Sequence, residues 1–115
     1  MIKIIRKNTS ETIIEKVKIA NTIKDKTLGL MFKKEMSGYD GLLILNCNAI
    51  HTHFMRFNLD AVFLDKENKV VKIIRNIKPW RFTKFYWKAN KVLESQAGSI
   101  TDSLKEGDEL GVVDV

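Results

Sequence analysis

Short runs of apolar residues, many of them alternating with polar ones, extend along most of the chain, which is the pattern of strands that face a core. The predicted strands lie at residues 1–7, 13–20, 42–45, 50–57, 60–65, 69–77, 91–95 and 109–113. Residues 42–45 are wholly apolar and bounded by turn residues, which favours a buried strand. Asn68 suits a bulge position and predicts a hairpin between residues 60–65 and 69–77.

One segment departs from this strand pattern. Its apolar stripe follows the spacing i, i+4, i+7 and i+8 of an amphipathic helix and consists of Ile23, Thr27, Leu30 and Met31. Asn21 or Thr22 can cap its start, and Asp25 in the first turn complements the helix dipole. The sequence therefore predicts one helix, from Thr22 to Phe32.

Many strands and one helix predict a mainly β fold with some α, namely a small antiparallel β-barrel or sandwich with one short helix packed against it. We expect residues 1–115 to form a single domain, because the chain is of one-domain length and contains no linker-like stretch. We also expect Val62, Leu64, Ile73 and Val92 to be buried.

Composition narrows the class of protein. Hydrophobic residues make up 44% and charged residues 30%, as in globular domains and unlike disordered or membrane chains. The first twenty residues lack the apolar core of a signal peptide, and no apolar run approaches the ~18 residues of a membrane span. Cys47 is the single cysteine, which suits a reducing compartment. We expect a cytoplasmic protein without a membrane span.

The formal charge of +6 is unevenly distributed. Residues 66–91 contain nine Lys or Arg and one Glu, a local balance of 9 − 1 = +8, so the rest of the chain carries 6 − 8 = −2. The protein is thus a nearly neutral domain with one basic segment, and an acidic protein or a polyanion is the partner that this asymmetry favours.

Several sequence blocks occur in an order that resembles a known family. The blocks are Gly29-Leu30-Met31, HFMRFNLDAVFLD at residues 53–65, KVVKI at residues 69–73, Pro79, VLESQAG at residues 92–98, and Gly107-Asp108. Together they resemble the prokaryotic family called domain of unknown function 192. The resemblance implies a small, mainly β, sandwich-like domain and no activity, because the family has no established one. His53 and Phe54 stand where the family usually has an aromatic residue and a tryptophan.

Cys47, His51 and His53 are residue types that bind zinc. On an extended strand over residues 50–57, both imidazoles would leave one face and could share an ion, with Met55 there as a weak copper ligand. Cys47 would lie about 13 Å from His51 along such a strand, too far for a shared ion or a thiolate–base pair unless the turn at residues 46–48 folds it back. We therefore interpret this segment as a core strand with hydrogen-bonded imidazoles, and predict no metal or other cofactor.

Arg56 and Asp60 share one side of the chain by their even spacing. A buried aspartate normally needs a partner, so we interpret the two as an ion pair that fixes the corner between two strands. The alternative is an anion contact through Arg56 in a pocket. A small-ligand or metal site near His51, His53, Met55, Arg56 and Asp60 stays open as a runner-up.

The basic segment interleaves cations with aromatic residues, as single-stranded nucleic acid binders do. The candidate contacts for a polyanion are Lys72, Arg75, Lys78, Trp80, Arg81, Lys84 and Trp87. A three-residue spacing alternates faces on a strand, so it forms no single stripe there, and the simplest interpretation is solvated charge. The segment contains no RNA-recognition, KH or helix-turn-helix signature.

These observations favour a non-enzymatic binding or accessory module over an enzyme, because the sequence offers no recognisable acid–base pair. The two alternatives are the small-ligand or metal site near His51 and Asp60, and weak polyanion or nucleic-acid binding through residues 66–91.

Overall fold

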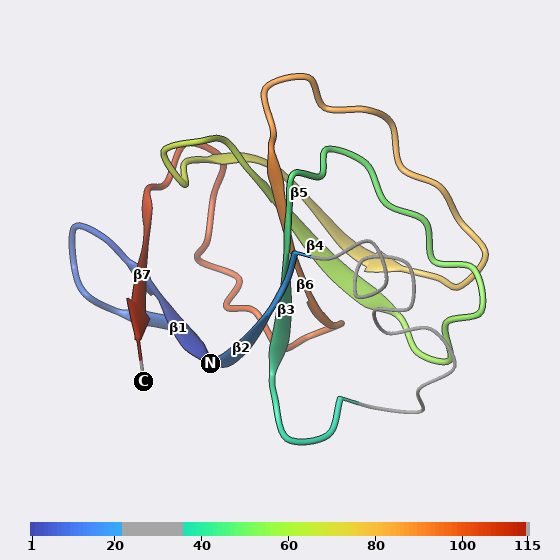
Figure 1. Ribbon diagram of the computed structural model, residues 1–115, viewed down its shortest axis with the longest axis horizontal. Coiled ribbons are helices and arrows are strands. Elements are labelled where there is room, and N and C mark those ends of the chain that lie inside the picture. The colour runs from blue at the N-terminus through green and yellow to red at the C-terminus, as the bar shows by residue number, and fades with distance from the viewer. Residues whose placement is uncertain (22–35, 115) are drawn as a thin grey trace.

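A computed structural model describes residues 1–21 and 36–114, and these residues form a single sheet of seven strands (Figure 1). The strands are β1 (Ile2–Arg6), β2 (Thr12–Ala20), β3 (Gly41–Leu45), β4 (Leu59–Leu64), β5 (Val70–Ile77), β6 (Lys91–Gln96) and β7 (Leu110–Asp114). Their order across the sheet is β5-β4-β6-β3-β2-β1-β7. Neighbouring strands are antiparallel except for the parallel pair β2 and β3.

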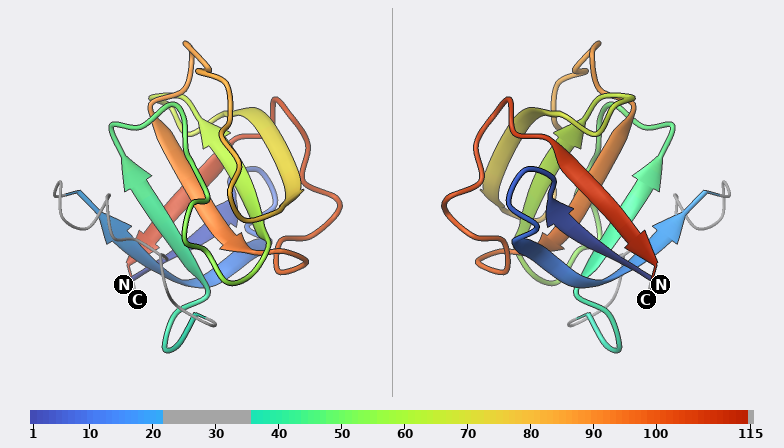
Figure 2. Two further views of the ribbon diagram at one scale, coloured as in Figure 1. Left: turned by 90° about the vertical axis from the view of Figure 1, so that its right-hand side faces the viewer. Right: turned by 90° about the vertical axis from the view of Figure 1, so that its left-hand side faces the viewer.

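The sheet curls into a half-barrel, so that the starts of its two edge strands meet (Figure 2). The Val70 N–H donates to the Asp108 carbonyl at 2.8 Å, and the Leu110 N–H donates to the Asn68 carbonyl at 2.9 Å. Asn68 has a φ of 63°, a left-handed conformation that asparagine tolerates in turns. These bonds occupy backbone groups at one end of both edges that would otherwise be open to another strand.

The concave face of the sheet encloses the larger apolar core. Ile4, Val17, Val62 and Leu93 are each 0% exposed and belong to this cluster. Ile100 and Leu104, from the segment between β6 and β7, complete it. Alternation along β4 and β6 directs the intervening residues to the opposite, outer face.

Two long loops cover part of the outer face. Residues 46–58 connect β3 to β4, and residues 78–90 connect β5 to β6; both pass in front of the sheet in the left view of Figure 2. Beneath them lie two smaller apolar clusters, one containing Leu42 and Leu59 and the other containing Phe63 and Val92. The outer face is therefore a second packed layer built largely from loops.

The structure confirms the mainly β fold and the seven strands whose predicted ranges coincide with β1 to β7. The predicted strand at residues 50–57 is wrong: apart from one bridge between His51 and Phe82, this segment is turn and irregular backbone. Ile50 and Met55 are buried because the segment packs on the sheet, which alternation alone cannot distinguish from a strand.

The predicted helix at Thr22–Phe32 lies outside the described residues, and residues 1–21 and 36–114 contain no helix. Val62, Leu64 and Val92 are buried as predicted, whereas Ile73 near the edge of the sheet is only partly buried. Across the described ranges, no helix is long and apolar enough to span a membrane.

Candidate functional site

A buried threonine joins the two loops. Thr52 is 1% exposed, and its hydroxyl donates to the Lys78 carbonyl at 2.7 Å and accepts from the Arg81 N–H at 2.9 Å. Its backbone N–H donates to the Arg81 carbonyl, and its carbonyl accepts from the Trp80 N–H. Further bonds join Ile50 to Thr83. The loops thus form one hydrogen-bonded unit whose side chains are held in place.

The loops expose large aromatic side chains. Trp87 is 85% exposed, Phe82 76%, Phe85 66% and Trp80 56%. Phe54 from the other loop is 44% exposed. Scattered exposed apolar residues are normal, but five large rings on two joined loops form the type of surface that contacts another molecule.

Several of these rings contact one another. His53 lies between Trp80 and Phe82, with ring centroids at 5.2 and 4.5 Å, and Phe54 meets Trp80 edge-on at 4.7 Å. Phe54 and Trp80 have φ values of 63° and 65°, a left-handed conformation that is rare for bulky residues. Such strain concentrates at functional sites, where the surrounding structure enforces it.

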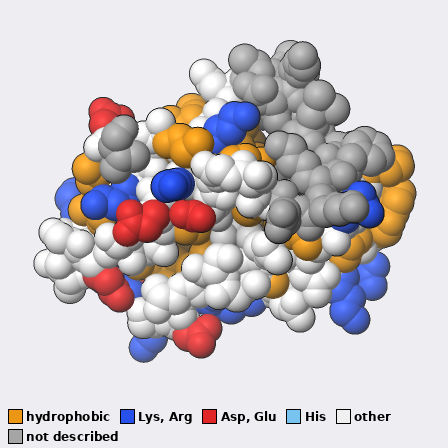
Figure 3. All heavy atoms as spheres, turned by 90° about the horizontal axis from the view of Figure 1, so that it is seen from below, with side chains coloured by type: hydrophobic (Ala, Val, Ile, Leu, Met, Phe, Trp, Pro, Cys, Tyr) orange, Lys and Arg blue, Asp and Glu red, His pale blue; other side chains and the backbone are white. Residues whose placement is uncertain are grey.

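The same loops carry positive charge without any negative charge. Residues 46–58 and 78–90 contain five Lys or Arg and no Asp or Glu. All five are exposed, and within the described ranges none forms an ion pair: Arg56, Lys78, Arg81, Lys84 and Lys88. On the face drawn in Figure 3, acidic side chains gather away from the end at the right, where hydrophobic and basic ones lie. We call these five cations and the five rings the aromatic–basic surface.

Two predicted polyanion contacts lie elsewhere. Arg75, on β5, donates to the carbonyls of Ile100 and Thr101 at 3.1 and 2.9 Å, so its guanidinium is engaged by the protein's own backbone. Lys72 is partly buried on the same strand. The remaining candidates, Lys78, Trp80, Arg81, Lys84 and Trp87, all belong to the aromatic–basic surface.

The two histidines lie close together, although residues 50–57 do not form the predicted strand. Their ring centroids are 5.0 Å apart, and the His53 N–H contacts Nδ1 of His51 at 3.3 Å. The His53 ring packs against Trp80 and Phe82, and the His51 ring lies near Phe82. Met55 instead is buried in the cluster of Leu42 and Leu59. Among the described residues, no three His, Cys, Asp or Glu side chains converge as a metal site would require.

Asp60 is a fully bonded buried carboxylate, as expected, but its cationic partner is not Arg56. Its Oδ1 accepts from the Asn76 N–H at 2.8 Å, and its Oδ2 accepts from the Gly98 N–H at 3.0 Å. Arg75 lies 3.6 Å from Oδ2, whereas Arg56 is exposed on the loop. Asp60 therefore ties β4 to the end of β5 and to the turn after β6, and the Arg56–Asp60 pairing was wrong because residues 50–57 are not a strand.

Glu94 is the unexpected residue of the outer face. It lies on β6 between Leu42 of β3 and Ala61 of β4 and is 5% exposed, and its carboxyl group has no hydrogen bond or ion pair to any described residue. Burial raises the pKa of Glu94 to about 7 from its ordinary value of 4.5. The sequence held one signal of it, a lone acid directly after two apolar residues in the strand predicted at residues 91–95.

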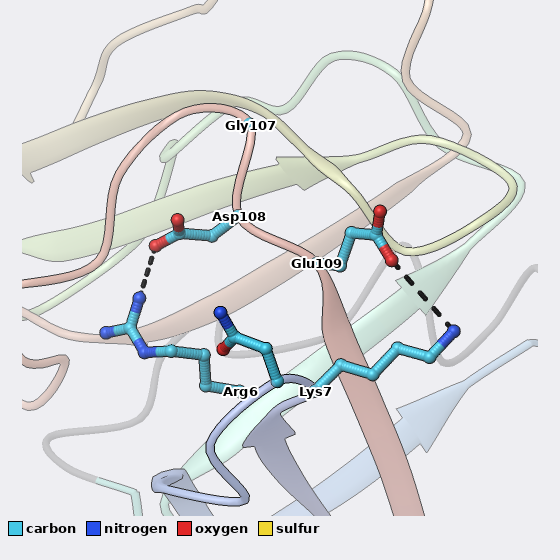
Figure 4. A pocket seen from close by; sticks show the side chains of 6 residues that line it. Arg6, Lys7, Gly107, Asp108 and Glu109 are labelled. Atoms are coloured by element: carbon cyan, nitrogen blue, oxygen red, sulfur yellow. Dashed lines mark hydrogen bonds and ion pairs between the residues drawn. The ribbon is translucent and has the colours of Figure 1, made fainter.

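A polar hollow of about 430 Å³ lies at the end of the molecule opposite the aromatic–basic surface, between β1 and the start of β7 (Figure 4). Arg6 pairs with Asp108 and, at 3.0 Å, with Glu11, and Lys7 lies 3.9 Å from Glu109. The bond to Glu11 and the charge of Asp108 raise the pKa of Arg6 above its ordinary value. Because the charged groups that line it pair with one another, we interpret this hollow as part of the fold and not as a binding site.

Comparison with known proteins confirms the family resemblance. The profile of domain of unknown function 192, described as an uncharacterized ACR family, matches residues 3–112. A UPF0127 protein of Pyrococcus horikoshii is 34% identical over 92 residues, which cover 77% of this chain and 78% of that protein. A UPF0127 protein of Thermococcus sibiricus is 34% identical over 102 residues, covering 84% and 65%.

Two solved structures share the fold. A protein of unknown function from Novosphingobium aromaticivorans superposes with a TM-score of 0.77 at 21% identity, covering 96% of this chain and 82% of that one. A candidate transcription regulator from Sinorhizobium meliloti gives a TM-score of 0.79 at 20% identity, covering 96% and 91%. At such identities the likeness establishes the fold alone.

Proposed function

The chain belongs to the family called domain of unknown function 192, which is uncharacterised, and we propose its function from its own surface. We propose that the protein is a non-enzymatic binding module that holds single-stranded nucleic acid on its aromatic–basic surface. The observation that carries this proposal is the exposure of four rings by more than half, among cations without an acidic neighbour in the loops.

The chemistry of a nucleic acid strand matches both components of the surface. Aromatic rings stack on bases of any sequence, each stack contributing about 1–3 kcal/mol, and Lys or Arg contact the phosphates between them. Lys84 and Lys88 flank Phe85 and Trp87 along the loop, so cations and rings alternate at close spacing. A folded duplex would hide the base faces that these rings require.

The hydrogen bonds of Thr52 support the same proposal. A surface that is ordered before binding loses less conformational entropy when the partner arrives. The ring contacts around His53 hold Trp80 and Phe82 in a fixed arrangement, and the left-handed backbone at Trp80 maintains it. The histidines of the runner-up small-ligand site thus become part of the stacking surface.

The second component is electrostatic and sets the expected salt dependence. If the five cations neutralise about five phosphates of a single strand, affinity should fall by roughly 100-fold between 50 and 200 mM salt. Binding should show little sequence preference from the phosphate contacts, because these carry no base information.

The test uses the intrinsic fluorescence of Trp80 and Trp87, which are the two tryptophans of the chain. We expect an octameric oligodeoxyuridine to quench this fluorescence at low salt, and Trp87→Ala to weaken binding by about 5- to 100-fold. Heparin provides charge without bases, so its affinity should change little in Trp87→Ala. The conservative variant Trp87→Phe keeps a stacking ring and should bind nearly as the unaltered protein.

Two results would overturn the proposal. Equal loss of heparin and oligonucleotide binding in Trp87→Ala would show that no base stacks on the ring. Binding to vesicles of anionic phospholipid without binding to oligonucleotide would assign the exposed rings to a membrane surface instead, since interfacial proteins also combine aromatic and basic side chains.

A further inference from the structure

The two histidines of the chain both lie against rings of the aromatic–basic surface. The His53 ring packs against Trp80 and Phe82 with centroid distances of 5.2 and 4.5 Å, and the His51 ring lies 5.0 Å from the His53 ring. Histidine is the side chain that ordinarily changes its charge between pH 5 and 8. A charge gained there would therefore lie beside the rings that stack on bases in the proposed function.

The two imidazoles differ in the hydrogen bonds of their ring nitrogens. Nδ1 of His51 accepts the backbone N–H of His53 at 3.3 Å, so a proton added to this nitrogen would break that bond. The ring nitrogens of His53 have no hydrogen-bond partner among the described residues, and both are accessible to solvent. His53 can therefore take up a proton, and donate both N–H groups, without losing a contact.

The charged side chains of the two loops are all positive. They are Arg56, Lys78, Arg81, Lys84 and Lys88. The other titratable groups of the elements packed around His53 are Cys47, His51 and Tyr86 in the loops and Glu94 on the outer face of the sheet. A phosphodiester that binds the loop cations brings negative charge close to His53, and a nearby negative charge favours the protonated form of an imidazole.

The neighbouring indole also suits a charged His53. The centroids of His53 and Trp80 are 5.2 Å apart, within the roughly 6 Å over which a cation is attracted to an aromatic face. The Trp80 N–H donates to the Thr52 carbonyl at 3.0 Å, which fixes the backbone of one loop beside the residue that precedes His53 in the other. The contact between the two rings is thus built into the joined loops.

We propose that His53 is a phosphate contact of the bound strand and that its imidazole takes up a proton from solvent as the strand binds. The inference rests on the proposed function, because the phosphate reaches His53 as part of a strand held on the aromatic–basic surface. The imidazolium N–H then donates to a phosphate oxygen in a charge-assisted hydrogen bond. Because coupling between two bound ligands is reciprocal, a strand that promotes protonation is bound more tightly as pH falls.

The test measures the affinity for a rhodamine-labelled deoxyuridine octamer by fluorescence anisotropy at pH 7.5 and 5.5, between 50 and 200 mM salt. Uracil and the phosphodiester gain no proton in this range, so a pH effect originates in the protein. At 50 mM salt we expect about 3- to 10-fold tighter binding at pH 5.5, which is the contribution of one added phosphate contact. The slope of log affinity against log salt should also be steeper by about 0.7, a change that a merely structural histidine would not produce.

Two substitutions of His53 and two controls identify the group that titrates. His53→Phe keeps a ring against Trp80 and Phe82, and His53→Gln keeps a polar side chain; each should bind with the same affinity and salt slope at both pH values. His51→Gln makes the matched change at the neighbouring histidine and should keep the affinity ratio between the two pH values. Glu94→Gln removes the carboxyl whose pKa burial raises to about 7 and should keep that ratio too.

The outcomes separate this inference from the function on which it rests. Equal affinity and slope of the unaltered protein at the two pH values overturn the inference and leave the binding function standing. A pH dependence that persists in both His53 variants, or that disappears in Glu94→Gln, also overturns it, because another group then takes up the proton. Binding at neither pH removes the proposed function and the inference together. Unfolding in urea at both pH values checks that the variants retain their fold.

Discussion

The two ends of the sheet use the same residue types in opposite ways. Between β1 and β7, Arg6 and Lys7 each face a carboxylate, so the charges there cancel and hold strands together. On the loops, none of the five cations has an acidic partner in the described ranges, and exposed rings lie among them. Charge that is paired within the fold stabilises it, whereas charge left unpaired beside apolar rings is available to a partner.

The interior repeats this contrast with two buried carboxylates. Asp60 accepts two backbone N–H bonds and lies near Arg75, whereas Glu94 has no partner in the described part of the chain. They lie on the neighbouring strands β4 and β6, and Asp60 points to one face of the sheet while Glu94 points to the other. The partners of a carboxylate, more than its burial alone, decide whether it supports the fold at neutral pH.

Charge reversal on the loops should have the largest effect on the molecule. Lys78→Glu, Arg81→Glu and Lys84→Glu together should weaken oligonucleotide binding by at least about 1,000-fold in 50 mM salt, because three phosphate contacts become repulsive. Fluorescence titration measures the change. The matched variant Lys16→Glu, Lys66→Glu and Lys105→Glu changes net charge equally at exposed positions elsewhere and should lose far less. Similar losses in both variants would show that net charge alone drives binding.

The second effect concerns Glu94 and depends on pH. The pKa of Glu94 is raised in the folded state, so its burial does not reduce the free energy of unfolding below pH 4.5, where the carboxyl is protonated. As pH rises, this free energy falls, and above pH 7 it is about 3 kcal/mol lower than at pH 4.5. Glu94→Gln removes this titration and should therefore stabilise the protein at pH 8 relative to its effect at pH 4.5. Urea unfolding at both pH values measures the difference.

A control at a solvated acid isolates the contribution of Glu94. The matched variant Glu67→Gln makes the same substitution at an exposed position in the β4–β5 turn and should change the free energy of unfolding little. If Glu94→Gln shifted stability equally at both pH values, the carboxyl would have a partner that keeps its titration ordinary.

Asp60→Ala should come next, destabilising the domain by about 1–3 kcal/mol at pH 7, since it leaves the Asn76 and Gly98 N–H groups without an acceptor. Asp60→Asn keeps one oxygen acceptor, so its free energy of unfolding should lie between those of Asp60→Ala and the unaltered protein. Urea unfolding measures both. Near-neutral stability of Asp60→Ala would point to a carboxylate used for a ligand rather than for the fold.

The smallest effect is expected where paired charges are solvated. Lys7 and Glu109 are 3.9 Å apart, with side chains 68% and 50% exposed, so Lys7→Ala should change the unfolding free energy by less than about 0.5 kcal/mol. Its oligonucleotide affinity should stay close to that of the unaltered protein. A large loss of affinity would extend the binding surface to the β1–β7 end and weaken the contrast between the two ends.

The sequence predicted the strands of this sheet well because their signal is local. Alternation and apolar runs located β1 to β7, and Asn68 marked the β4–β5 hairpin, since side-chain period and turn conformation depend on neighbouring residues alone. The same local rule failed at residues 50–57, where packing against the sheet imitates a strand. The residue types of the aromatic–basic surface were also visible in the sequence, through the interleaving of Trp80 and Arg81 with their neighbours.

Tertiary structure alone decided which of those residues act together. Asp60 pairs with Arg75 of the neighbouring strand β5 instead of Arg56. His53 packs against Trp80 and Phe82 because loops distant in sequence meet over the sheet. Burial of Glu94 depends on the strands on both sides of it. Composition and periodicity record the chemical nature of each side chain. Only the folded chain determines its distance to a partner and its access to water, on which pairing and binding depend.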